Sequence, residues 1–125
     1  MVLKRVMVVE DEALIRELVA RILRQAGYEV VGCGSGNVCL ALLEAGFQGV
    51  ILMDIKMPDM DGWETIATMA HLGYTQTNVI SLMSGYAAFE PEHAELLQHV
   101  RGALRKPFRA DELVQAVNAC ATAVA

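Results

Sequence analysis

The stretch Gly49-Val50-Ile51-Leu52-Met53 ends abruptly at Asp54. A short apolar run of this kind predicts a strand buried on both faces, and a carboxylate at its end lies where parallel sheets gather functional groups. The start of the chain repeats the pattern, because residues 5–10 read as a buried strand and Asp11 stands where a helix N-cap would. Two such strands favour an α/β domain with a parallel sheet.

Outward from these strands, helical and strand patterns alternate along the chain. Residues 12–25 carry apolar side chains at three- and four-residue spacing, and Gly27 is a natural C-terminal stop for that helix. Ser35-Gly36 opens a second helix, and further helices are predicted at 63–71, 91–99 and 111–121, of which 91–99 has the weakest pattern. Strands are predicted at 28–32, 78–83 and, marginally, 102–105. Five strands alternating with five helices predict a doubly wound, five-stranded parallel sheet.

Composition narrows the function classes. The 125 residues suit a single domain, 1–125, and with 54% apolar and 20% charged residues the chain is expected to be globular. A net charge of −5 argues against direct binding of nucleic acid or an anionic membrane. No apolar run approaches the roughly 20 residues of a membrane span, so we expect a cytoplasmic protein. The three cysteines form no C-x-x-C pair and are expected to be small buried hydrophobes.

Functional groups follow four of the five predicted strands. Glu10 and Asp11 follow the first, Asp54 the third, Ser84 the fourth and Lys106 the fifth. Each alone has an ordinary explanation, as a helix cap, a polar strand end, a turn former or a solvated charge. Together they converge at one edge of the sheet, where three carboxylates repel one another unless a cation intervenes, and hard oxygen ligands suit Mg²⁺. The sequence therefore predicts a phosphoryl site with a divalent cation.

Four motifs resemble the receiver domain of two-component response regulators. They are Val8-Val9-Glu10-Asp11, the run Met53-Asp54-Ile55-Lys56-Met57-Pro58-Asp59-Met60-Asp61-Gly62, then Met83-Ser84-Gly85-Tyr86, and Lys106-Pro107-Phe108. The likeness covers essentially the whole chain and implies the flavodoxin-like receiver fold. It also implies a phosphorylation-dependent signalling module, a phosphoacceptor with self-catalysed transfer and dephosphorylation and not an enzyme in the ordinary sense.

The resemblance implies a role for each site residue. Asp54 is similar to the phosphoacceptor, a carboxylate nucleophile. Asp11 resembles the direct Mg²⁺ ligand and Glu10 its partner, which often acts through water, while the backbone carbonyl of Lys56 completes the protein's share. Mn²⁺ is the alternative metal.

Two further residues are expected to contact the phosphoryl oxygens. Ser84 resembles the hydroxyl that moves to one of them, and Lys106 resembles the cation that pairs with another. The Lys106-Pro107 peptide bond is expected to be cis by the same resemblance.

Three positions are expected to modulate the site. Lys56 and Tyr86 occupy positions that in receivers flank the path of attacking water. Ala103 stands three residues before the site lysine, where most receivers carry an aromatic ring or histidine that turns inward on phosphorylation. A methyl group has no rotamers to couple, so this chain departs from the usual switch.

The expected partners are a sensor histidine kinase or a histidine phosphotransfer protein, and a downstream protein target or fused output domain. Because the chain ends soon after the last helix, it is either a stand-alone receiver or a piece of a hybrid kinase or larger regulator. One alternative is a haloacid-dehalogenase-like phosphatase, but such enzymes carry a second Asp where this chain has Lys56. Another is a degenerate receiver that serves only as a binding module, which would require the loss of a site residue.

Overall fold

The computed structural model describes residues 4–85 and 91–122. In chain order, the elements are β1 (Arg5–Val9), α1 (Ala13–Gln25), β2 (Glu29–Cys33), α2 (Gly36–Glu44), β3 (Val50–Asp54), α3 (Gly62–His71), the 3₁₀ helix η1 (Tyr74–Gln76), β4 (Val79–Ser84), the 3₁₀ helix η2 (Pro91–His99), β5 (Val100–Arg105) and α4 (Ala110–Thr122). The five strands form one parallel sheet in the order β2-β1-β3-β4-β5. The predicted doubly wound fold is confirmed.

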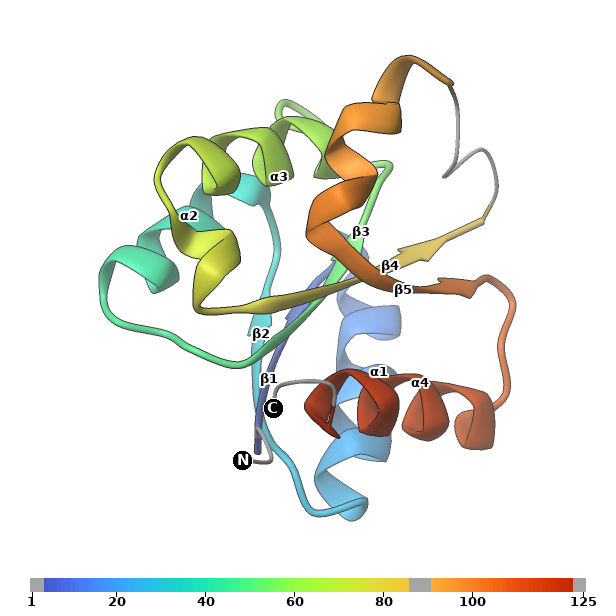
Figure 1. Ribbon diagram of the computed structural model, residues 1–125. Helices are drawn as coiled ribbons and strands as arrows, with labels where there is room; N and C mark the ends of the chain where they lie inside the picture. The colour runs from blue at the N-terminus through green and yellow to red at the C-terminus, as the bar shows by residue number, and fades with distance from the viewer. Residues whose placement is uncertain (1–3, 86–90, 123–125) are drawn as a thin grey trace.

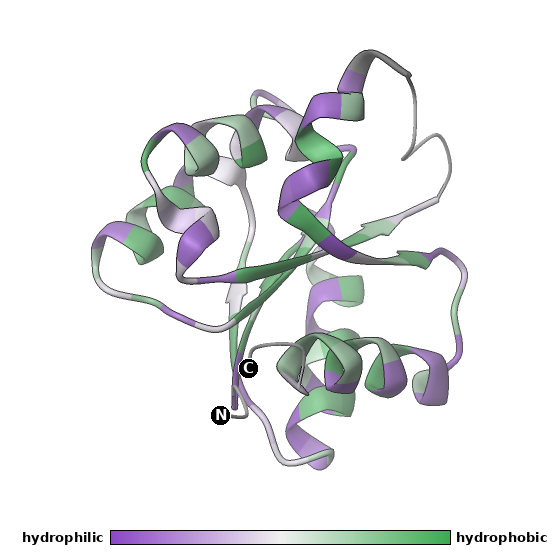
Figure 2. Ribbon diagram, viewed as in Figure 1, coloured by the Kyte–Doolittle hydropathy of each residue, from purple (hydrophilic) through white to green (hydrophobic). Residues whose placement is uncertain are grey.

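Helices cover both faces of the sheet (Figure 1). Helices α2, α3 and η2 lie on one face, and α1 and α4 lie on the other. Neighbouring strand residues point to opposite faces, so the apolar runs of the central strands serve two cores at once. One core contains Met7, Val9, Ile51, Met53, Ile80 and Leu82, and the other contains Val6, Val8, Val50, Leu52, Val79 and Leu104. Figure 2 shows most of the central strands β1, β3 and β4 in the green of hydrophobic residues.

The predicted helix ends are confirmed at two places. Gly27 follows α1 with a φ of 99°, a conformation that residues with a Cβ rarely adopt, and so stops the helix. Ser35 caps α2 by accepting a hydrogen bond from the backbone N–H of Val38 at 3.2 Å. The three cysteines are buried and free, as expected from their number and spacing.

The prediction that Asp11 is the N-cap of α1 is wrong. The N-cap residue is Glu12, and its side chain makes no capping hydrogen bond. The reason lies one residue before Asp11, because the Glu10 carboxylate accepts a hydrogen bond from the Glu12 N–H at 3.3 Å. Asp11 therefore stays exposed and does not contribute a capping bond at this helix end.

Two helical segments differ from their sequence pattern. The weak helix at 91–99 is 3₁₀ and not α; Leu96 and Leu97 there are only partly buried against the core, so packing does little to enforce the α-helical period. In α1, Val19 and Leu23 are buried, but Leu14 and Leu18 are 84% and 55% exposed. The apolar face of α1 therefore extends beyond the part of the helix that packs against the rest of the protein, and Leu14 and Leu18 stay exposed.

Candidate functional site

The three carboxylates predicted from the strand ends lie together. Glu10 directly follows β1 and Asp54 ends β3, and these strands are neighbours in the sheet. One carboxylate oxygen each from Glu10, Asp11 and Asp54 lies within 4.8 Å of the other two. Glu10 and Asp54 are buried, and Asp11 is exposed. An oxygen cluster of this size can hold a small divalent cation with its outer side open to water.

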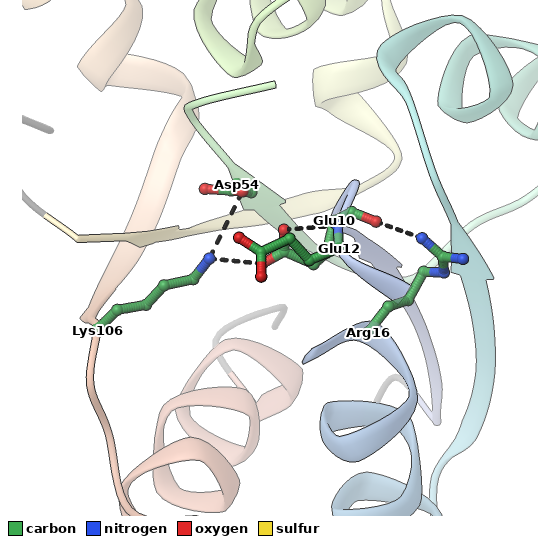
Figure 3. A network of polar contacts seen from close by, with 5 residues as sticks. All are labelled: Glu10, Glu12, Arg16, Asp54 and Lys106. Atoms are coloured by element: carbon green, nitrogen blue, oxygen red, sulfur yellow. Dashed lines mark hydrogen bonds and ion pairs between the residues drawn. The ribbon is translucent and has the colours of Figure 1, made fainter. Parts of the chain in front are cut away.

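Lys106, which directly follows the edge strand β5, brings a positive charge into this cluster. Its Nζ donates a hydrogen bond to Glu10 Oε1 at 2.5 Å and lies 3.5 Å from Asp54 Oδ2 (Figure 3). Burial works against its charge, but the two carboxylates outweigh burial and raise the pKa of Lys106. The Lys106-Pro107 peptide bond is cis, as the family resemblance implies.

The two buried carboxylates differ in their protonation. Burial, together with the hydrogen bond and repulsion from Glu10, raises the pKa of Asp54 to about 7, although Lys106 opposes the change. Burial also disfavours the charged form of Glu10, but hydrogen bonds with Lys106, Asp54 and the Glu12 backbone outweigh it and lower the pKa of Glu10. One cation from Lys106 therefore does not suffice to keep Asp54 fully ionised at neutral pH.

The loop after Asp54 is held close to β3 by a glycine. The Gly62 N–H donates to the Ile55 carbonyl at 2.9 Å, and a Cβ on Gly62 would lie 2.4 Å from the Asp54 carbonyl oxygen, closer than any side chain allows. Asp61 and Glu64 then start α3 with a capping box. The start of α3 is thus packed directly against the backbone of Asp54, and Lys56 lies in the short loop between them.

Ser84 lies at the same edge of the sheet. It is buried at the end of β4, one residue after Met83, which pairs with Asp54 in the sheet register. Its backbone carbonyl accepts a hydrogen bond from the Lys106 N–H at 2.8 Å. The ladder between β4 and β5 therefore sets Ser84 and Lys106 side by side.

The two remaining modulating positions have different outcomes. Tyr86 lies outside the residues that the structure describes. Ala103 lies in β5 opposite Leu82 and is exposed. The fifth strand thus carries no ring at the position where most receivers are expected to have one.

Sequence reasoning missed Arg16, whose guanidinium Nη1 donates to the backbone carbonyl of Glu10 at 2.6 Å. Figure 3 shows Arg16 and Lys106 approaching Glu10 from opposite sides. Gly32 and Gly34, two exposed glycines beneath the Arg16 side chain, are the sequence feature that could have indicated this contact. They indicate it only once the crossing of α1 over the end of β2 is known.

A sequence model of the response regulator receiver domain matches residues 6–118. The chain belongs to this family. The match excludes the haloacid-dehalogenase-like phosphatase as an alternative. Receiver domains serve two-component signalling as phosphoacceptors and not as classical enzymes, and in general they work with a histidine kinase. No described helix of this receiver is long and apolar enough to cross a membrane.

Individual relatives agree with the family assignment. The receiver is 34% identical over 120 residues to the transcriptional regulatory protein PdtaR of Mycobacterium tuberculosis, covering 91% of this chain and 55% of that protein, so it spans about half of that relative's length. A CheY-like receiver domain protein from Methanospirillum hungatei superposes with a TM-score of 0.85 at 35% identity, covering 91% of this chain and 90% of that one. TrrA of Thermotoga maritima, solved in complex with Mg²⁺ and BeF, gives 0.77 at 28% identity, covering 90% and 94%.

Proposed function

We propose that this receiver accepts one phosphoryl group on Asp54 and changes its surface in response. The observation that carries the proposal is the position of the Asp54 carboxylate, which lies within 4.8 Å of two other carboxylates and 3.5 Å from the Lys106 ammonium. The Lys106 ammonium can neutralise charge on one side of this nucleophile, and the carboxylate cluster can hold a metal ion on the other. The proposed unit is a single receiver domain spanning residues 1–125, which the family match over 6–118 supports.

The donor set of the cluster fits Mg²⁺, with Mn²⁺ as the alternative. Glu10, Asp11 and Asp54 offer only hard oxygen ligands, and the backbone carbonyl of Lys56 is the fourth proposed donor. Burial, together with the hydrogen bond and repulsion from Glu10, raises the pKa of Asp54 even beside Lys106, so a bound cation would favour its charged form. The solved complex of TrrA with Mg²⁺ and BeF supports the same choice of metal. When bound, the metal supplies the charge neutralisation that phosphoryl transfer needs.

In the proposed step, an Asp54 oxygen attacks the phosphorus of a phosphohistidine. The new O–P bond forms as the N–P bond breaks, and the imidazole leaves as a neutral ring after taking up a proton. Lys106 pairs with one developing phosphoryl oxygen and the Ser84 hydroxyl donates to another, so that charge is stabilised where it accumulates. Lys56 and Tyr86 are proposed to shield the product from attacking water.

The proposed donor is a sensor histidine kinase or a histidine phosphotransfer protein. Because this partner must bring its imidazole to Asp54, it has to dock at the carboxyl edge of the sheet. The exposed Leu14 and Leu18 lie one turn apart on α1, which starts beside Asp11, and offer an apolar surface at that place. The proposed output is a downstream protein or a fused domain, in the cytoplasm, where ATP is available to phosphorylate the donor histidine.

Intact-mass spectrometry after incubation with acetyl phosphate and Mg²⁺ tests the proposal. We expect wild type to gain a single phosphoryl group and Asp54→Asn to gain none, and EDTA to prevent labelling. Asp59→Asn is the matched control, because Asp59 is an exposed carboxylate in the same loop and should label as wild type does. Equal labelling of wild type and Asp54→Asn would exclude Asp54 as the acceptor.

A further inference from the structure

Arg16 binds the end of β1 from the side opposite Lys106. Its backbone N–H makes an early hydrogen bond of α1, to Glu12 at 2.9 Å, and its guanidinium returns to the Glu10 carbonyl at 2.6 Å. That carbonyl belongs to the peptide unit joining Glu10 to Asp11. The hydrogen bond is charge-assisted, which makes it short and stronger than one between neutral groups.

The side chain of Arg16 is itself held in place by two glycines. A Cβ on Gly32 would lie 3.2 Å from Arg16 Cδ and 3.3 Å from Cγ, and a Cβ on Gly34 would lie 3.4 Å from Nη1. The stem of Arg16 therefore lies across the end of β2 in the space that these glycines leave open. Among the described residues, the Arg16 guanidinium forms no ion pair with a carboxylate. Its hydrogen bond in this part of the chain is the one to the Glu10 carbonyl.

The contact fixes the peptide plane that connects two of the candidate metal ligands. The preceding peptide unit is already held, because the Glu10 N–H donates to the Cys33 carbonyl at 3.0 Å. A peptide unit is planar, so holding its carbonyl oxygen also sets the positions of the Asp11 N and Cα, from which its side chain leaves. Without Arg16, that carbonyl is free to rotate while Glu10 stays anchored through its carboxylate to Lys106.

We propose that Arg16 is a positioning residue, which holds the Glu10–Asp11 peptide so that both carboxylates face the metal. It lies outside the proposed ligand set, and the inference rests on the proposed function. Outer residues that orient metal ligands typically change metal affinity 10- to 100-fold when removed. Arg16 acts here through a backbone carbonyl and not through a ligand side chain.

The test compares Arg16→Met with Arg24→Met by calorimetric titration with Mg²⁺ alone. Arg24 is the matched control, since it lies on the same helix and donates to a backbone carbonyl of β2, that of Val30, at 3.0 Å. We expect the dissociation constant for Mg²⁺ to rise at least about tenfold in Arg16→Met. In Arg24→Met it should stay within twofold of wild type.

A second readout needs no metal. Loss of the hydrogen bond to the Glu10 carbonyl should shift the amide ¹⁵N resonance of Asp11 in Arg16→Met and not in Arg24→Met. If Arg16→Met fails to fold, Arg16→Lys replaces it with Arg24→Lys as its control, because lysine keeps the stem over Gly32 and the charge but lacks the planar fork.

The outcomes separate this inference from the proposed function. Wild type that binds Mg²⁺ and labels on Asp54, beside an Arg16 variant with unchanged Mg²⁺ affinity, would overturn the positioning role alone. Wild type that binds no Mg²⁺ would contradict the proposed function, and the inference with it. A tenfold loss confined to the Arg16 variants supports both.

Discussion

Lys106 Nζ lies 2.5 Å from Glu10 Oε1, a hydrogen bond between residues 96 positions apart in the chain. It joins the end of β1 to the segment after β5, and β3 and β4 lie between these two strands in the sheet. The Glu10 side chain has no exposed surface, so Lys106 is the cation that makes burial of this carboxylate tolerable. The same ammonium is the one we propose to meet the phosphoryl group.

We expect Lys106→Met to destabilise the metal-free protein, because it leaves a buried carboxylate without its partner. Removing one member of a buried ion pair typically costs about 3–5 kcal/mol. Urea denaturation in EDTA measures the change, with Lys4→Met as an exposed control. Combining Lys106→Met with Glu10→Gln should recover part of the loss, since the second substitution removes the stranded charge. Additive losses in the double variant would mean that the two residues are not coupled.

Asp54→Asn should make the metal-free protein more stable at pH 8 than wild type. The pKa of Asp54 is raised from 3.8 to about 7, so the folded state binds this proton more tightly than the unfolded state does. The stability that this provides is complete below about pH 4 and is lost as pH rises through 7. The difference between variant and wild type should therefore grow with pH over this range, up to about 4 kcal/mol.

Urea denaturation in EDTA at several pH values measures this difference, which includes the accompanying change in the titration of Glu10, because the two carboxylates interact. Asp59→Asn should show no comparable trend. A difference between Asp54→Asn and wild type that stays constant from pH 4 to 8 would contradict the raised pKa.

Asp11→Ala is expected to abolish Mg²⁺ binding while leaving the fold intact. Asp11 is exposed and makes no capping hydrogen bond at the start of α1, so its removal deprives the cluster of a ligand without opening the core. Mg²⁺ at about 100 times its dissociation constant should stabilise wild type by about 2.7 kcal/mol. Thermal melts should show no such gain for Asp11→Ala, and Asp59→Asn should behave as wild type does.

Removal of Asp11 should also relieve repulsion within the cluster. The metal-free variant is therefore expected to melt at or above the temperature of metal-free wild type. A clearly lower melting temperature in EDTA would show that Asp11 stabilises the fold in its own right.

The sheet and the convergence of its site were predictable because both depend on short local patterns. Apolar runs that end in Glu10, Asp54 and Ser84 need no knowledge of distant contacts, and a parallel sheet brings strand ends to one edge whatever the helices do. The prediction for the N-cap of α1 was wrong because the Glu10 carboxylate, held by Lys106, accepts the hydrogen bond from the Glu12 N–H at that helix end. Tertiary contacts decided the outcome there, and sequence patterns do not contain them.

Other features depend on how elements cross. The contact of Arg16 with Glu10 requires α1 to pass over the end of β2, and the exposure of Leu14 requires α4 and β2 to leave part of α1 uncovered. The stack of Trp63 on His93 joins α3 to η2, two segments that the sequence separates by 30 positions. None of these features can be predicted from the residues that lie next to it in the chain.

This stack links α3, which begins against Asp54, to η2 by a path that does not involve the fifth strand. Ala103 has no ring to move, whereas Trp63 follows Gly62, whose Cα packs against the Asp54 carbonyl. Trp63 is 3% exposed, and its ring lies 4.6 Å from that of His93 at an interplanar angle of 12°. We therefore expect a change in the Asp54 backbone to reach η2 through Trp63 and His93, whose rings are in contact.

We expect Mg²⁺ with beryllofluoride to change the fluorescence of Trp63, the only tryptophan of the chain. In two-dimensional NMR, amides from residue 84 to 99 should shift strongly, and those of β5 only slightly, because the exposed methyl of Ala103 transmits little. His93→Ala should keep the Mg²⁺ affinity of wild type but reduce the shifts within η2. His71→Ala, an exposed histidine at the end of α3, is the control and should leave them unchanged.

The opposite pattern would exclude this path. Large shifts spread over β5 and α4 beside a quiet η2 would mean that the fifth strand reports the state of Asp54 without a ring. Unchanged η2 shifts in His93→Ala would mean that the stack is only packing. Because α3 begins against Asp54 and the stack is the aromatic contact described between α3 and η2, we expect the signal to leave the site on the face of the sheet opposite α1 and α4.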